Sequence, residues 1–95
     1  MPFDVSDIVS PTRGHDSGTL LFIVKLEDNY AYLVDGKHRP LSRPKKKNIR
    51  HIRRVGRSDC PAAEKIRKGE PLTDSEIRRS LARFATGASE DEGGM

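Results

Sequence analysis

The side chains with the clearest chemical potential are basic, and they are concentrated in one segment of the chain. Ten of the 21 residues between positions 37 and 57 are Lys or Arg, and none is Asp or Glu. Ammonium and guanidinium groups at this density attract a polyanion, because the polyanion releases its condensed counterions on binding. The segment, called the basic tract below, contains Lys37, Arg39, Arg43, Lys45, Lys46, Lys47, Arg50, Arg53, Arg54 and Arg57.

The positive charge of the chain is local. The basic tract carries +10, whereas residues 1–36 carry −4 and residues 58–95 carry −2, which gives a net charge of +4. Such a distribution predicts a confined surface patch that binds nucleic acid. The alternative is a disordered or merely solvated tract, because blocks of like charge often have no other role.

Other chemistries find little support among the residue types. The single Cys60 excludes a disulfide within the chain and a Cys-rich zinc site, and no metal-like spacing relates His15, His38 and His51. A histidine, an acid and a hydroxyl adjoin at residues 15–17, but catalytic groups normally converge from separate elements. We therefore expect no catalytic residues, no metal, no cofactor and no small-molecule substrate.

Length and hydropathy limit the scaffold that can carry the basic tract. With 95 residues, 34% hydrophobic and without Trp, the chain has room for one small domain with a minimal core. The longest apolar run, residues 20–24, is too short for a membrane span, and the first residues lack the pattern of a secretion signal. We expect a monomeric, cytoplasmic protein that does not contact a membrane.

The first half of the chain has the alternation and turn residues of short strands. Strands are expected at residues 7–10, 19–26, 30–34, 37–42 and 51–55, with a loop at 11–18 and a turn at 27–29. Asp35-Gly36 favours a two-residue hairpin turn, so residues 37–42 are expected to return antiparallel to the preceding strand. Pro40 and Pro44 cannot donate to a sheet, which predicts that this strand lies at an edge or is broken near those positions, with its basic side chains facing solvent.

The last third of the chain has a helical pattern. Asp59 is expected to cap a helix that begins near Pro61 and stops at Gly69. A capping box of Thr73 and Glu76 signals a second helix, which ends before Gly87. Its apolar stripe is expected to dock on the strands or on a partner, and consists of Ile77, Leu81 and Phe84.

These elements define a fold class that is mostly β with C-terminal α. Five short strands suggest a strongly bent sheet or partly open barrel, followed by one or two short helices. We expect a barrel domain at residues 1–56 that includes most of the basic tract, and a helical extension at residues 57–88. Residues 89–95 are acidic and glycine-rich and are expected to be disordered.

The segment IVSPTRGHDSGTLLFIV at residues 8–24 resembles a KOW motif, in which a strand, a loop with two glycines four residues apart and a hydrophobic strand follow one another. Gly14 and Gly18 can adopt positive φ and let a phosphate approach the backbone. The sequence YLVDG at residues 32–36, followed by the basic tract, is similar to the L-fourteen-e type of large-subunit ribosomal proteins and their small bacterial relatives. The resemblance covers residues 5–55 and implies an SH3-like barrel that binds RNA.

The resemblance also implies where RNA is contacted. Family members commonly have Lys or Arg after the second loop glycine, whereas this chain has Thr19, which offers only a hydroxyl. Tyr30 and Tyr32 can stack on an unpaired base, although strand tyrosines are more often partly buried packing residues. The expected RNA-binding residues are the ten of the basic tract together with Arg13, Gly14, His15, Gly18 and Thr19.

Two functions from different classes remain open. The first is a non-enzymatic RNA-binding protein that binds ribosomal RNA and is associated with the ribosome or its assembly, with ribosomal proteins as further candidate partners. The second is a protein-interaction adaptor of the transcription or translation machinery that uses the barrel or the helical stripe. Truncation after Gly56 is expected to separate them, because RNA binding would survive and an adaptor activity of the helix would not.

Overall fold

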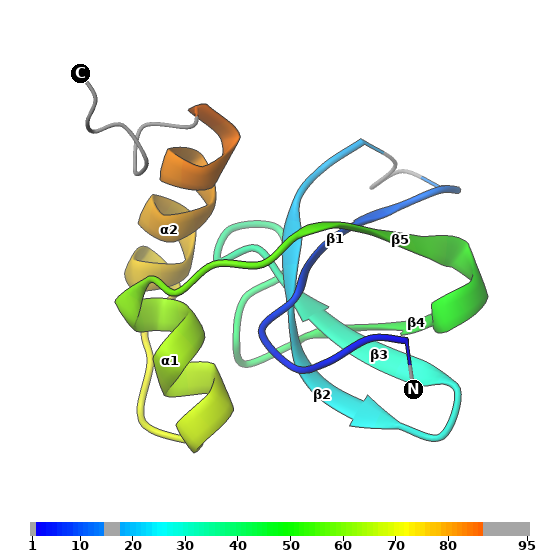
Figure 1. Cartoon of the computed structure of the whole chain (residues 1–95), viewed down its shortest axis with the longest axis horizontal. Coiled ribbons are helices and arrows are strands. Elements are labelled where there is room, and N and C mark those ends of the chain that lie inside the picture. Colours follow the sequence, from blue (N-terminus) through cyan, green and yellow to red (C-terminus); the bar gives the residue numbers. More distant parts are fainter. Residues whose placement is uncertain (1, 15–17, 87–95) are drawn as a thin grey trace.

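A computed structural model of the chain describes residues 2–14 and 18–86 (Figure 1). Five strands, β1 (Ile8–Pro11), β2 (Leu21–Glu27), β3 (Tyr30–Val34), β4 (Lys45–Asn48) and β5 (Ile52–Gly56), form one antiparallel sheet in the order β4-β3-β2-β1-β5. A 3-10 turn, η1 (Ile49–His51), joins the two edge strands directly, so the sheet bends into a small barrel-like domain. The expectations for residues 15–17 and 89–95 lie outside the described residues.

Two helices, α1 (Pro61–Lys68) and α2 (Asp74–Thr86), follow the sheet, which confirms the expected class of mostly β with C-terminal α. The helices lie at one end of the molecule, and η1 lies at the other (Figure 1). Three of the expected strands are shifted by one or two residues: β1 is Ile8–Pro11 and not 7–10, β2 is Leu21–Glu27 and not 19–26, and β5 is Ile52–Gly56 and not 51–55.

The sheet is apolar on both faces, as the alternation in β2 indicates. Leu21 and Ile23 pack inside the strands, in a buried cluster with Val9, Ala31, Leu33 and Ile52. Phe22 points to the opposite face and contributes to a second cluster that includes residues of both helices: Ile8, Val34, Ala63, Ile77 and Leu81. A small sheet with two apolar faces needs cover on its outer face, and the helices provide it.

The apolar stripe of α2 docks on the sheet, which was one of its two expected destinations. Ile77 is fully buried, Leu81 is buried, and Phe84 packs against the same cluster. The contact is close at the end of β5, where a Cβ atom on Gly56 would lie 2.6 Å from Cζ of Phe84. The helices and the sheet therefore share one hydrophobic core.

The structure confirms the expected N-terminal cap of α2 but not that of α1. Thr73 and Glu76 form the expected capping box, in which the Thr73 N–H donates to Oε1 of Glu76 at 2.9 Å and the Glu76 N–H donates to Oγ1 of Thr73 at 3.2 Å. The expected cap of α1 by Asp59 is wrong, because the N-cap is Cys60, whose Sγ accepts a hydrogen bond from the Ala63 N–H at 3.4 Å. Asp59 instead lies 3.5 Å from the guanidinium of Arg67.

The segment after Asp35-Gly36 is a loop, so the expected return strand at residues 37–42 is wrong. Oδ1 of Asp35 accepts hydrogen bonds from the N–H groups of Lys37 and Arg39, both at 2.8 Å, and these bonds replace a strand ladder. The strand that pairs with β3 is β4, which begins at Lys45. Residues 35–44 therefore connect β3 and β4 without regular structure.

Contacts with α2 fix this loop. The Leu41 N–H donates to Oδ1 of Asp74 at 2.8 Å, and the Arg78 guanidinium donates to the Gly36 carbonyl at 2.6 Å. Gly36 has a φ of +79°, and a Cβ atom there would lie 2.4 Å from the carbonyl oxygen of Asp74. A glycine is required at this position for both its conformation and its close approach to the helix.

Candidate nucleic-acid interface

The densest part of the basic tract forms an edge strand of the sheet. Lys45, Lys46 and Lys47 occupy three of the four positions of β4, which pairs with β3 on one side only. Successive side chains of a strand point to opposite faces, so Lys46 projects from one face and its two neighbours project from the other. Lys46 is exposed, and the other two lysines are half-buried.

Both ends of the loop at residues 11–18 contain further candidate RNA-binding residues. The N-terminal end of the loop lies beside β4. Nζ of Lys47 donates a hydrogen bond to the Arg13 carbonyl at 3.2 Å, and the Thr12 N–H donates to the carbonyl of His51 at 2.8 Å. Gly14 and Gly18 both have a φ of +88°, as the sequence suggested. Arg13 is exposed, as is Thr19 on the other end of the loop, while His15 lies outside the described residues.

The positive surface continues from β4 through η1 into β5. Asn48 caps η1, because its Oδ1 accepts a hydrogen bond from the Arg50 N–H at 3.0 Å. Arg50 and Arg53 are both exposed on either side of the half-buried His51. No carboxylate of residues 2–14 or 18–86 forms an ion pair with the five cations named the edge group below: Lys45, Lys46, Lys47, Arg50 and Arg53.

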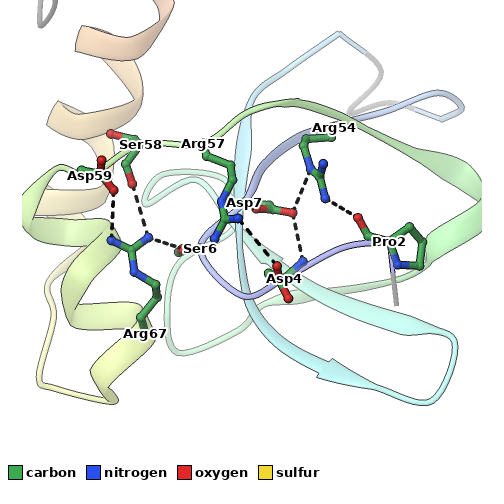
Figure 2. A network of polar contacts seen from close by, with 9 residues as sticks. All are labelled: Pro2, Asp4, Ser6, Asp7, Arg54, Arg57, Ser58, Asp59 and Arg67. Atoms are coloured by element: carbon green, nitrogen blue, oxygen red, sulfur yellow. Dashed lines mark hydrogen bonds and ion pairs between the residues drawn. The ribbon is translucent and has the colours of Figure 1, made fainter.

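Two arginines at the end of the tract have a different role (Figure 2). Nε of Arg54 lies 3.0 Å from Oδ2 of Asp7, and Nε of Arg57 lies 3.3 Å from Oδ1 of the same carboxylate, which is fully buried. The contact of Arg57 has ion-pair distance without hydrogen-bond geometry, so Oδ1 has no hydrogen-bond donor. A buried carboxylate needs such partners, because its desolvation is costly.

The same network fastens the N-terminal segment to β5. Oδ2 of Asp7 also accepts a hydrogen bond from the Asp4 N–H at 2.9 Å, and Arg54 donates to the Pro2 carbonyl (Figure 2). Arg57 reaches the Asp4 carboxylate at 3.7 Å. Arg54 and Arg57 thus neutralise a carboxylate of their own chain. The sequence marks them as basic but gives no sign of the pairing, because Asp7 is about 50 positions away.

The remaining members of the tract lie in the loop at residues 35–44. Lys37 and Arg43 are exposed there, and Arg39 is half-buried. Because α2 fixes this loop, these cations are closer to the helical end of the molecule than the edge group is. The structure therefore divides the tract into a loop group, the edge group and the pair that binds Asp7.

A groove on the described surface lies away from the basic tract, between the start of α1 and α2. This groove of about 670 Å³ is lined by Cys60, Phe84, Arg79 and Arg83 among others, and by no member of the basic tract. Burial raises the pKa of the Cys60 thiol, but hydrogen bonds from Ser58, Ala63, Ser80 and Ala62 outweigh that effect and leave the pKa below its ordinary value. Nothing in the groove indicates a ligand.

Comparisons with known proteins add no assignment. Among the described residues, no helix is both long and apolar enough to span a membrane, and no three His, Cys, Asp or Glu side chains are grouped to hold a metal ion. No family model matches the chain, and no curated protein matches it.

Proposed function

We propose that the chain is a non-enzymatic RNA-binding protein that docks on structured ribosomal RNA, either in the ribosome or during its assembly. The observation that supports this most strongly is the edge group, whose five cations lie on the edge strand β4, on η1 and at the start of β5. No carboxylate in the described parts of the chain neutralises them. Cations without a carboxylate partner keep their full charge for the phosphates of a polyanion.

The proposed mechanism is positioning by phosphate contacts. Arg50 and Arg53 can each direct two donors to one phosphate, whereas the three lysines of β4 act as compact point charges. Arg13 extends the same surface from the adjacent loop, and its carbonyl already contacts Lys47. Such contacts fix the orientation of the protein on RNA with little dependence on sequence.

The strand–loop–strand arrangement around Gly14 and Gly18 supports a KOW-type reading of the domain. In that reading the described start of the loop, at Arg13 and Gly14, lies beside the basic edge and offers backbone amides to the same RNA. Assignment to the KOW type, and to ribosomal RNA in particular, rests on the sequence resemblance together with this placement.

Lysines on an edge strand can also serve the protein without binding RNA. They prevent sheets from pairing between molecules, and a purely protective role predicts no RNA affinity. An adaptor would need a free apolar surface, but Ile77 and Leu81 of the helical stripe are buried against the sheet. An adaptor function therefore depends on the surface of the barrel or on the groove lined by Phe84, and not on Ile77 and Leu81.

The proposal predicts that the chain sediments with large ribosomal subunits or their precursors from cell lysate at low salt. Raising the salt concentration is expected to release it, because exposed charge contacts are screened. The measurement is the distribution of the chain across a sucrose gradient at both salt concentrations. Absence from every ribosomal fraction at low salt would contradict the ribosomal assignment, and RNase treatment of the lysate is the control.

Neighbouring arginines in β5 are predicted to behave differently. Arg53→Ala is expected to weaken RNA binding while changing the free energy of unfolding by less than about 0.5 kcal/mol, because its side chain is exposed. Arg54→Ala is expected to lower the free energy of unfolding by about 1 to 3 kcal/mol, because it removes a hydrogen-bond donor from the buried Asp7. Urea unfolding and RNA titration of both variants test this, and equal stability losses would contradict it.

A further inference from the structure

Two tyrosines and two lysines form a second surface on the sheet, on the face opposite to Lys45 and Lys47. In the register of the strands, Lys25 of β2, Tyr32 of β3 and Lys46 of β4 form one cross-strand row. The adjacent row contains Glu27, Tyr30 and Asn48. Residues on one face of adjacent strands contact each other, so these six side chains form a continuous patch, named the tyrosine platform below.

The platform remains uncovered although other parts of the same face are buried. Further along β2 and β3, Phe22 and Val34 are fully buried in the core shared with the helices. Tyr30, in contrast, is 39% exposed, and among the described residues it and Val55 are the two exposed large hydrophobic side chains. The β2–β3 hairpin extends away from α1 and α2 (Figure 1), so the helices do not reach the tyrosines.

The rings are oriented before any ligand binds. The Tyr32 hydroxyl donates a hydrogen bond to Oε1 of Glu27 at 2.9 Å, which holds the ring across the sheet. Nζ of Lys46 lies 4.6 Å from the centre of the Tyr30 ring, and Nζ of Lys25 lies 5.2 Å from the centre of the Tyr32 ring. These cation–π contacts place an ammonium group at the face of each ring.

We propose that the tyrosine platform binds unpaired nucleotides of a single-stranded RNA segment, with bases stacked on Tyr30 and Tyr32 and phosphates bound by Lys46 and Lys25. Aromatic rings beside cations provide both contacts that a nucleotide needs, because each nucleotide has a base that can stack and a phosphate that can bind a cation. Lys46 belongs to the edge group as well, so the platform is continuous with the proposed phosphate surface. The inference rests on the proposed function and adds the class of RNA that this face selects.

Intrinsic fluorescence of the full chain tests the platform directly. Tyr30 and Tyr32 are the two tyrosines, and there is no Trp, so tyrosine emission reports on the platform alone. We expect a single-stranded oligouridylate to quench this emission by stacking, whereas inorganic polyphosphate binds without comparable quenching because it has no bases. Equal changes with both ligands, although both bind, would overturn the inference while leaving phosphate binding intact.

Substitutions at the more exposed tyrosine provide a second readout. Tyr30→Leu is expected to weaken oligouridylate binding by about fivefold or more, with Tyr30→Phe close to wild type because the ring is retained. Affinity for a fully paired RNA duplex of the same length is expected to change by less than about twofold in both variants, because its bases are already stacked. Circular dichroism confirms the fold of each variant.

The possible results separate the two proposals. Unchanged oligouridylate binding by Tyr30→Leu, or an equal loss on single strand and duplex, would overturn base stacking while RNA binding itself stands. Failure of the wild-type chain to bind single strand, duplex and polyphosphate would overturn the proposed function and the platform together. Loss confined to the single strand and reversed in Tyr30→Phe supports the platform.

Discussion

Deletion of residues 57–95 is expected to abolish cooperative folding of the barrel. The deletion removes both helices and leaves Ile8, Phe22 and Val34, all fully buried in the intact chain, facing water. Burial of a side chain of this kind contributes about 1.5 to 3 kcal/mol, so the three together account for about 5 to 9 kcal/mol. The free energy of unfolding of a whole domain is only about 5 to 15 kcal/mol.

Thermal unfolding followed by circular dichroism measures this effect. The fragment of residues 1–56 is expected to show no cooperative transition, whereas the intact chain shows one. A stable, cooperatively folding fragment would contradict a core shared between sheet and helices.

A pair of substitutions in α2 keeps the shared core testable if the fragment aggregates. Ile77→Ala is expected to lower the free energy of unfolding by about 2 to 5 kcal/mol, because the side chain is fully buried. Arg79→Ala, an exposed position of the same helix, is expected to change the free energy of unfolding by less than about 0.5 kcal/mol.

The shared core also affects the truncation after Gly56, which was expected to separate RNA binding from adaptor activity. Because this truncation is expected to unfold the barrel, point variants must replace it.

Most of the elements could be predicted from local sequence. The alternation of residues 30–34 and the capping box at Thr73 gave the correct elements, because their causes lie within a few residues of the effect. The return strand after Asp35 could not be placed in this way. Asp35-Gly36 is compatible with a tight hairpin, but Asp74 and Arg78 fix the following loop from a helix far along the chain.

The candidate site shows the same division between local and distant causes. Composition alone located the basic tract, but the sequence does not show which of its ten cations bind a partner within the chain and which remain available to RNA. Their roles depend on distant neighbours, since Asp7 binds Arg54 and Arg57 while Lys47 contacts the loop at Arg13. The tyrosine pair was recognised as aromatic, but its row of flanking lysines became visible only with the register of three strands.

Replacing Lys45, Lys46 and Lys47 together by Ala is expected to cause a large loss of RNA affinity. The three side chains come from one short strand, and removing them eliminates about two to three units from the slope of log K against log salt. If the variant and the wild type bind equally at 1 M salt, this slope difference makes the affinity of the variant about 100- to 1000-fold lower than that of the wild type at 0.1 M salt. The fold is expected to persist, because none of the three is buried.

A charge-matched variant distinguishes a local surface from general attraction. Replacing Lys68, Arg79 and Arg83 by Ala also removes three positive charges, but from exposed positions of the two helices. Because these positions lie on the helices, outside the edge group, we expect the slope to change by less than about one unit. Equal losses in the two triple variants would indicate that net charge alone, and not the edge group, determines binding.

The most direct test is the affinity of the purified wild-type chain for a structured RNA, measured across a salt series beside both triple variants. With about five to seven phosphates neutralised, log K is expected to fall with log salt at a slope of roughly −4 to −6 in the wild type. The slope is expected to be flatter by about two to three units in the β4 variant, and nearly unchanged in the helix variant. Affinity independent of salt, or an unchanged slope without Lys45, Lys46 and Lys47, would contradict RNA binding through this edge of the sheet.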